Sequence, residues 1–148
     1  MRYLLTLLAL VILAGCAPSL SPLYRDFEDD TPTGDDVFAR IDRALGEAGW
    51  TTVPAVTANA IATEPRSFRS WGLYSVEIEL EVVPMAGDHV RVFVNPYRKF
   101  FQGTRRKVPY VRKGWARAVV GDLSDALEAE GLTYMGTAQQ RDRLAGAR

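Results

Sequence analysis

The sequence predicts an α+β domain in which an antiparallel sheet of about four strands is covered on one face by two amphipathic helices. Two apolar patterns with a helical period, at residues 35–48 and 112–130, flank a central region whose apolar residues alternate at every second position. Helical segments before and after a run of strands are typical of this architecture, because each element buries its apolar face against another. The 148 residues are the length of a single domain.

The N-terminal segment has the layout of a secretory signal peptide. A basic residue is followed by an apolar run over residues 4–13, and the segment ends in Leu13-Ala14-Gly15-Cys16, which contains the only cysteine. These four residues resemble the lipobox of bacterial lipoproteins. The resemblance implies that residues 1–15 are removed as a signal peptide. It also implies that Cys16 is acylated with diacylglycerol and palmitate-like chains and becomes the first residue of the mature chain.

Two alternatives exist for this segment: a cleaved signal without lipid on Cys16, and a retained transmembrane helix. The apolar run is about half of the ~20 residues that a membrane-spanning helix needs, so the sequence favours cleavage. A lipid anchor would be firm, since each buried methylene contributes about 0.8 kcal/mol and a lipoprotein cysteine carries more than one chain. Ala17 stands where similar lipoproteins retained in the inner membrane have aspartate. The sequence therefore predicts an outer-membrane protein that faces the periplasm.

Residues 16–34 are predicted to form a lipidated tether between the membrane and the domain. Three prolines would interrupt any helix there: Pro18, Pro22 and Pro32. Acidic residues gather between positions 26 and 30, which is typical of a solvated spacer. In the alternative, Tyr24 and Phe27 pack on the domain.

The first amphipathic helix is predicted over residues 35–48. Thr33 and Asp36 have the spacing of a helix-start box, and Gly49 provides the stop. Apolar residues follow at helical spacing: Val37, Phe38, Ile41, Ala44, Leu45 and Ala48. Charged residues lie on the opposite side, so one face of this helix is expected to cover the sheet.

From Trp50 onward, the apolar pattern has the period of two that is typical of strands. Residues 51–53 predict a strand at an edge of the sheet, because Pro54 cannot donate a backbone hydrogen bond. A second short strand is predicted over residues 59–63. Residues 65–72 are expected to form a loop or an irregular extension of a strand.

The clearest strand pattern runs over residues 74–82. Its apolar residues alternate with Glu77, Glu79 and Glu81, which predicts one buried face and one acidic face toward solvent or a partner. A hairpin turn is expected at residues 84–88. The chain then returns through three inward-facing valines: Val90, Val92 and Val94.

The C-terminal third begins with a basic stretch and continues with a helix. Residues 98–117 contain eight lysines and arginines and no acid, and a loop is expected within them. The second amphipathic helix is predicted over residues 112–130. A short extended piece follows, so that the single domain spans residues 35–135. Residues 136–148 form a polar tail that is either a short helix or frayed.

The basic stretch is the best candidate for a binding site. Five aromatic residues interleave with its cations: Tyr97, Phe100, Phe101, Tyr110 and Trp115. Cations beside aromatic rings suit an anionic ligand such as a lipid phosphate, a polyanionic glycan or an acidic protein face. The candidate binding residues are Arg98, Lys99, Arg105, Arg106, Lys107, Tyr110, Arg112 and Lys113. The alternative is a solvated basic loop that balances the acidic tether and the row of glutamates.

The sequence predicts neither catalysis nor a cofactor. His89 is the only histidine, so a metal site is not expected. The serines lack a recognisable general base, and a row of glutamates on an exposed strand face is expected to be solvated. Basic and acidic residues number 18 each, so the chain has no general attraction to nucleic acid.

The order helix, strands, helix, together with the lipid anchor, is similar to the helix-grip domains of accessory lipoproteins in the outer-membrane barrel-assembly machinery. The similarity covers residues 35–131. It implies a non-catalytic envelope protein that binds another envelope protein or supports an assembly. The basic aromatic region 97–117 supports a second class, a lipid- or glycan-binding module. The sequence leaves both classes open.

Overall fold

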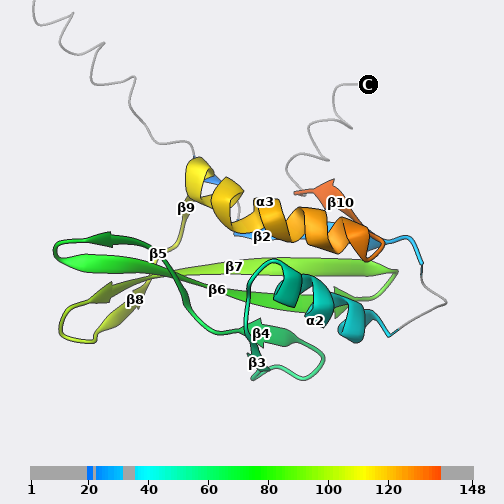
Figure 1. The fold of residues 1–148 in the computed structure, drawn as a ribbon, viewed down its shortest axis with the longest axis horizontal. Coiled ribbons are helices and arrows are strands. Elements are labelled where there is room, and N and C mark those ends of the chain that lie inside the picture. The colour runs from blue at the N-terminus through cyan, green and yellow to red at the C-terminus, as the bar shows by residue number, and fades with distance from the viewer. Residues whose placement is uncertain (1–19, 22, 32–35, 138–148) are drawn as a thin grey trace, which may run out of the picture.

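A long antiparallel hairpin forms the centre of the fold (Figure 1). Strands β6 (Tyr74–Met85) and β7 (His89–Phe100) have 12 residues each and pair along their whole length. The structure is a computed structural model that describes residues 20–21, 23–31 and 36–137. Strands β2, β4, β5 and β8 all pair with one of the two strands of this hairpin.

The predicted signal peptide and Cys16 lie outside the described residues, as does the polar tail from residue 138 onward. The cleavage, the lipid anchor and the conformation of the tail therefore stay predictions. Within the described ranges, no helix is long and apolar enough to cross a membrane.

The alternation that predicted a strand at residues 74–82 is confirmed and continues through both strands of the hairpin. One face carries the buried apolar residues: Val76, Ile78, Leu80, Val82, Val90, Val92 and Val94. The turn at residues 86–88 is closed by left-handed backbone at Gly87 (φ 79°) and Asp88 (φ 58°). Glycine and aspartate tolerate that conformation, so the expected hairpin turn forms where the sequence placed it.

Six more strands extend the hairpin into a sheet of eight antiparallel strands. They are β2 (Tyr24–Asp29), β3 (Thr52–Pro54), β4 (Ile61–Thr63), β5 (Arg66–Trp71), β8 (Arg105–Lys107) and β10 (Leu132–Gly136). The main path of the sheet is β10-β2-β7-β6-β4-β3, while β5 pairs with β6 and β8 pairs with β7. The prediction of about four strands was thus too low. The additional strands are mostly short or polar, and three residues are too few to show an alternation.

Two helices cover the apolar face of the sheet, as predicted. Helix α2 (Val37–Glu47) begins at Asp36, whose carboxylate accepts a hydrogen bond from the backbone N–H of Phe38 at 3.0 Å. Helix α3 (Lys113–Ala129) contacts α2 and strand β10. A single core joins the helices to the sheet, and its helical members are Ile41, Ala44, Leu45, Val119, Val120, Leu123 and Leu127.

The stretch predicted as a tether contributes a strand to the sheet. Strand β2 lies between β7 and β10, and the side chain of Phe27 is fully buried, 5.4 Å from the ring of Tyr134. The prediction of a tether over residues 16–34 was therefore wrong for residues 24–29. Its acidic residues misled the prediction, because Asp26 is paired with Arg91 of β7 at 2.7 Å and is not solvated. Strand β7 supplies the cation for Asp26, and helix α2 supplies Arg40 for Asp29.

A second, two-stranded sheet lies at the start of helix α3. Strand β1 (Leu20–Ser21) pairs antiparallel with β9 (Val111–Arg112), and Leu20 stands opposite Arg112. Helix α3 follows β9 directly, and the side chain of Val111 is buried in the core. This pairing holds the first described residues against the middle of the chain.

Candidate functional site

The basic stretch is divided between the two faces of the sheet. Strand β8 folds back on β7, so that Arg106 stands opposite Arg98, and Arg105 stands opposite Lys99. Residues paired across antiparallel strands share a face, and neighbours along a strand point to opposite faces. Arg98 and Arg106 therefore lie on the helix-covered face. The other three cations that the basic stretch contributes to these strands, Lys99, Arg105 and Lys107, lie on the opposite face.

On that opposite face, two of the cations bind glutamates of β6. Glu77 lies 3.0 Å from the ammonium of Lys99 and 3.2 Å from Nε of Arg105, and Arg105 also reaches Glu79 at 2.7 Å. Glu77 is only 6% exposed. The prediction of a fully solvated acidic face was therefore wrong at Glu77. The predicted loop becomes strand β8, and this strand brings Arg105 over the glutamates.

The charge of Arg105 is part of this arrangement. Partial burial works to lower its pKa, but the hydrogen bond to Glu79 and the charges of Glu79 and Glu77 outweigh burial and raise the pKa above the ordinary value. Its guanidinium also stacks 4.3 Å from the ring centroid of Tyr97. Arg105 and Lys99 are thus engaged within the domain.

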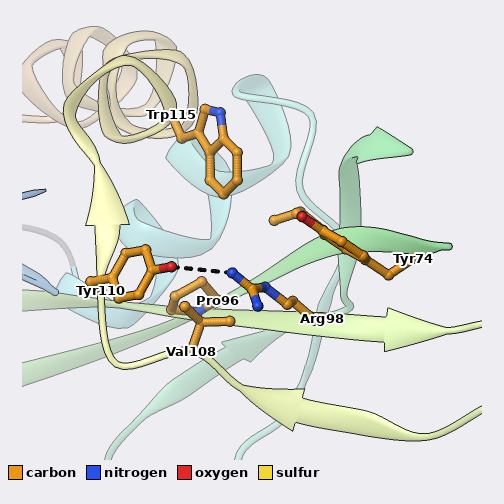
Figure 2. A pocket seen from close by; sticks show the side chains of 7 residues that line it. Tyr74, Pro96, Arg98, Val108, Tyr110 and Trp115 are labelled. Atoms are coloured by element: carbon orange, nitrogen blue, oxygen red, sulfur yellow. Dashed lines mark hydrogen bonds between the residues drawn. The ribbon is translucent and has the colours of Figure 1, made fainter. Parts of the chain in front are cut away.

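Arg98 stands in a pocket on the helix-covered face (Figure 2). Its Nη2 donates a hydrogen bond to the hydroxyl of Tyr110 at 3.1 Å, and its guanidinium carbon lies 5.2 Å from the ring centroid of Tyr74. The pocket has a volume of about 190 Å³ and is lined by Tyr74, Val76, Pro96, Arg98, Val108, Tyr110 and Trp115. We call it the Arg98 pocket.

Three elements place the aromatic walls of the Arg98 pocket. Tyr74 begins strand β6, and Trp115 lies in the first turn of helix α3. Tyr110 directly precedes strand β9 and lines the pocket, while the next residue, Val111, is buried in the core. The described neighbours of Arg98 include no carboxylate within ion-pair distance. Its positive charge is therefore not neutralised in the way that those of Lys99 and Arg105 are.

Arg106 adds a second cation to the same face. Like charges placed directly opposite each other on neighbouring strands are unfavourable, and Arg98 and Arg106 stand opposite each other. No carboxylate among the described residues pairs with Arg106 either. An anion bound between these side chains would remove the repulsion.

An apolar groove adjoins the Arg98 pocket. It is lined by Leu73, Phe100, Phe101, Gln102, Thr104 and Arg106 and has a volume of about 520 Å³. The ring of Phe100 lies 6.0 Å from the ring of Tyr74, which links the groove to the pocket. Leu73 and Phe101 are 77% and 80% exposed. We call this the Phe101 groove.

The structure brings together part of the predicted site. Arg98 and Tyr110 meet in one pocket, and Arg106 lies beside it, whereas Lys99, Arg105 and Lys107 are on the other face. Arg112 ends strand β9 and Lys113 begins helix α3, and only their backbone is described. The lipidation residue, Cys16, lies outside the described residues.

Two residues of the site were missed at the sequence level. Tyr74 was assigned to the buried face of a strand, and Leu73 was not singled out at all. The available signal was the alternation of β6, because Tyr74 shares a face with Val76 but lies at the strand end, where it is only partly buried. Gly72-Leu73 between two strands also predicts an exposed turn.

Chemically, the site is suited to binding an anion. An arginine guanidinium keeps its charge and offers five N–H donors, of which the phenol of Tyr110 uses one. The described lining holds no histidine, cysteine, lysine or carboxylate. Among the residues that the structure describes, no group of three metal-binding side chains comes together.

Neither the family models nor the curated proteins give a match to this chain. Its function must therefore be argued from its own residues.

Proposed function

We propose that this protein is a non-catalytic lipoprotein of the cell envelope, anchored by lipid on Cys16, that binds an anionic partner in the Arg98 pocket. The localisation we propose is the outer membrane, facing the periplasm. One observation carries the binding role: Arg98 is half-buried between aromatic walls and faces no carboxylate among the described residues.

The surroundings of Arg98 favour anion binding over simple solvation. Charge-assisted hydrogen bonds from a guanidinium to a phosphate or carboxylate are about twice as strong as neutral ones, and they are often bidentate. The rings of Tyr74, Tyr110 and Trp115 reduce the access of water to the guanidinium. Electrostatic attraction is stronger where water is displaced, so the same cation binds an anion better here than on an open loop.

The pocket also supports binding rather than chemistry. General acid–base catalysis needs a group that can exchange a proton at working pH, such as histidine or a carboxylate. The described lining offers two phenols and a guanidinium, together with Trp115 and apolar side chains. We therefore place the activity of the protein in recognition.

The proposal is tested with hexyl phosphate, a soluble probe with an anionic head and a short chain. A chain that begins at Ala17 retains every described residue, including the whole core from Phe27 to Leu132, and is the form to use. Isothermal titration should show binding that Arg98→Gln weakens by about tenfold or more, because a hydrogen bond to a charged group contributes roughly 1.5–3 kcal/mol.

The matched control is Lys107→Gln. It removes the same charge from an exposed side chain on the opposite face, so it should leave the affinity for hexyl phosphate within about twofold of the parent. Equal losses in the two variants would mean that general charge and not the Arg98 pocket attracts the anion. No binding by the parent chain would refute the site.

A further inference from the structure

We infer that the partner of the Arg98 pocket is the anionic phospholipid surface of the membrane that carries the anchor. Arg98 and Arg106 would meet lipid phosphates, and Leu73 and Phe101 would enter the apolar boundary beneath them. This inference rests on the proposed function and names the partner of the same site. It is carried by three observations.

The first observation is a pair of exposed apolar side chains at one end of the sheet. Leu73 lies in the turn between β5 and β6, Phe101 follows β7, and both line the Phe101 groove. Figure 1 shows the β5–β6 turn and the β7–β8 connection at the same end of the sheet, on the left and away from helix α2. Apolar side chains at the tips of neighbouring hairpins form a small patch that is suited to insertion at a membrane interface.

The second observation is the charge beside that patch. Arg106 lines the same groove, and Arg98 stands opposite it on the helix-covered face. The nearest glutamates of β6, Glu77 and Glu79, are on the other face and are held there by Lys99 and Arg105. The surface beside Leu73 and Phe101 is therefore positive, and an anionic lipid surface attracts such a surface at short range.

The third observation is the short connection to the predicted anchor. Cys16 precedes Leu20 by four positions. A fully extended chain spans at most about 3.5 Å per residue, so Leu20 lies within ~14 Å of the acylated cysteine. Because β1 is paired with β9, this limit applies to the end of the domain that holds Tyr110 and the start of α3. The walls of the Arg98 pocket are thus held near the lipid headgroups.

These observations favour a lipid surface over an acidic protein. An acidic protein face would satisfy the cations but would leave Leu73 and Phe101 without a reason to be exposed beside them. The short connection also limits how far the pocket can reach from the membrane. The lipid surface accounts for the cations, the apolar pair and the connection together.

The test is vesicle flotation with the chain that begins at Ala17, so that the anchor contributes nothing. The vesicles contain either phosphatidylcholine alone or phosphatidylcholine with about one third phosphatidylglycerol. The chain should bind the anionic vesicles at 0.1 M salt and lose most of this binding at 0.5 M, since salt screens exposed charges within about 10 Å at 0.1 M. The joint variant Leu73→Ser, Phe101→Ser should bind about tenfold more weakly.

The control variant is Val56→Ser. Val56 is 106% exposed but lies in the loop between β3 and β4, away from the groove. It should float with anionic vesicles as the parent chain does, and an equal loss in both variants would overturn the inference. All three side chains are exposed, so melting temperatures should stay close to that of the parent and exclude unfolding as the cause.

The two proposals fail differently. Binding of hexyl phosphate that depends on Arg98, without any preference for anionic vesicles, would overturn the lipid surface and leave the anion site in place. If the chain bound neither hexyl phosphate nor anionic vesicles, the anion site itself would be refuted. A photo-crosslinker at position 101 in intact cells should label lipid, and labelling of a protein instead would assign the surface to an acidic envelope protein.

Discussion

At the scale of single residues, Arg40 shows how this domain uses a buried charge. The residue is 5% exposed and donates hydrogen bonds to the carboxylate of Asp29, to the hydroxyl of Thr31 at 3.0 Å and to the backbone carbonyl of Glu130 at 2.9 Å. These partners come from the end of strand β2, the chain beyond it and the end of helix α3. One guanidinium thus joins helix α2 to the end of strand β2 and to the residue after helix α3, which is 90 positions away in the sequence.

The same contacts act on Asp29. Burial works to raise its pKa, but the hydrogen bonds from Arg40 and Thr31 and the charge of Arg40 outweigh burial and hold the pKa below its ordinary value. A carboxyl with a lower pKa in the folded state stabilises the fold above its unfolded pKa, and the contribution is lost as pH falls through the folded value. The free energy of unfolding should therefore decline below about pH 4.

Arg40→Met should be less stable by about 3 kcal/mol at pH 7, because it leaves the carboxylate of Asp29 buried without its cation. The decline of stability at acidic pH should also become shallower than in the parent. Urea denaturation between pH 3 and pH 7 measures both effects. The control is Arg43→Met, which removes a half-exposed partner of Glu130 and should cost about 1 kcal/mol or less. Unchanged stability of Arg40→Met would contradict the central role of this pair.

At the scale of elements, strand β2 is where the structure differs from the prediction, because a strand replaces part of the predicted tether. Phe27→Ala should lower the free energy of unfolding by about 3–5 kcal/mol, because it opens a cavity in the core. The same substitution in a solvated tether would hardly change the free energy of unfolding. Chemical denaturation measures the difference, and Glu28→Ala, an exposed neighbour on the same strand, should stay within about 0.5 kcal/mol of the parent.

The sequence predicted the elements that have many apolar positions. Both helices and the β6–β7 hairpin are long enough for their periods to be read, and each ends near a glycine or a turn. Strand β8 could not be predicted, because Arg105–Lys107 contains no apolar residue and is held by its pairing with β7. Strand β2 was hidden because two of its three carboxylates, those of Asp26 and Asp29, are neutralised by partners on other elements.

The sequence could predict which residue types the site contains, but not how they are arranged. The sequence located cations and aromatic residues in one stretch, and Arg98 and Tyr110 indeed meet. It could not assign them to faces, because the assignment depends on the register in which β8 pairs with β7. Tyr74 comes from β6, the partner strand of β7, and Leu73 comes from the turn before it, and only the fold brings both to the basic stretch.

At the scale of the whole molecule, the proposed lipid anchor on Cys16 would determine where the domain works. On the lipobox interpretation, Cys16→Ser should abolish labelling with fatty acid and leave an uncleaved or soluble precursor, because the variant lacks the thiol that would take the lipid. Metabolic labelling with palmitate and fractionation of membranes measure this outcome. A variant that still carries label and sediments with membranes would contradict the lipobox interpretation, and recovery of the parent in the inner membrane would contradict its sorting.

The pairing of β1 with β9 also limits how far the domain could stand from a lipid anchor at Cys16. With β1 paired, the first paired residue, Leu20, is four positions from Cys16 in the sequence. Without this pairing, the first described residue held to the sheet would be Leu23, whose carbonyl accepts a hydrogen bond from the backbone N–H of Val94 at 2.8 Å. The reach from Cys16 would then grow from ~14 Å to ~25 Å over seven positions. If Cys16 carries lipid as proposed, the two residues of β1 therefore determine how closely the domain is confined to the bilayer.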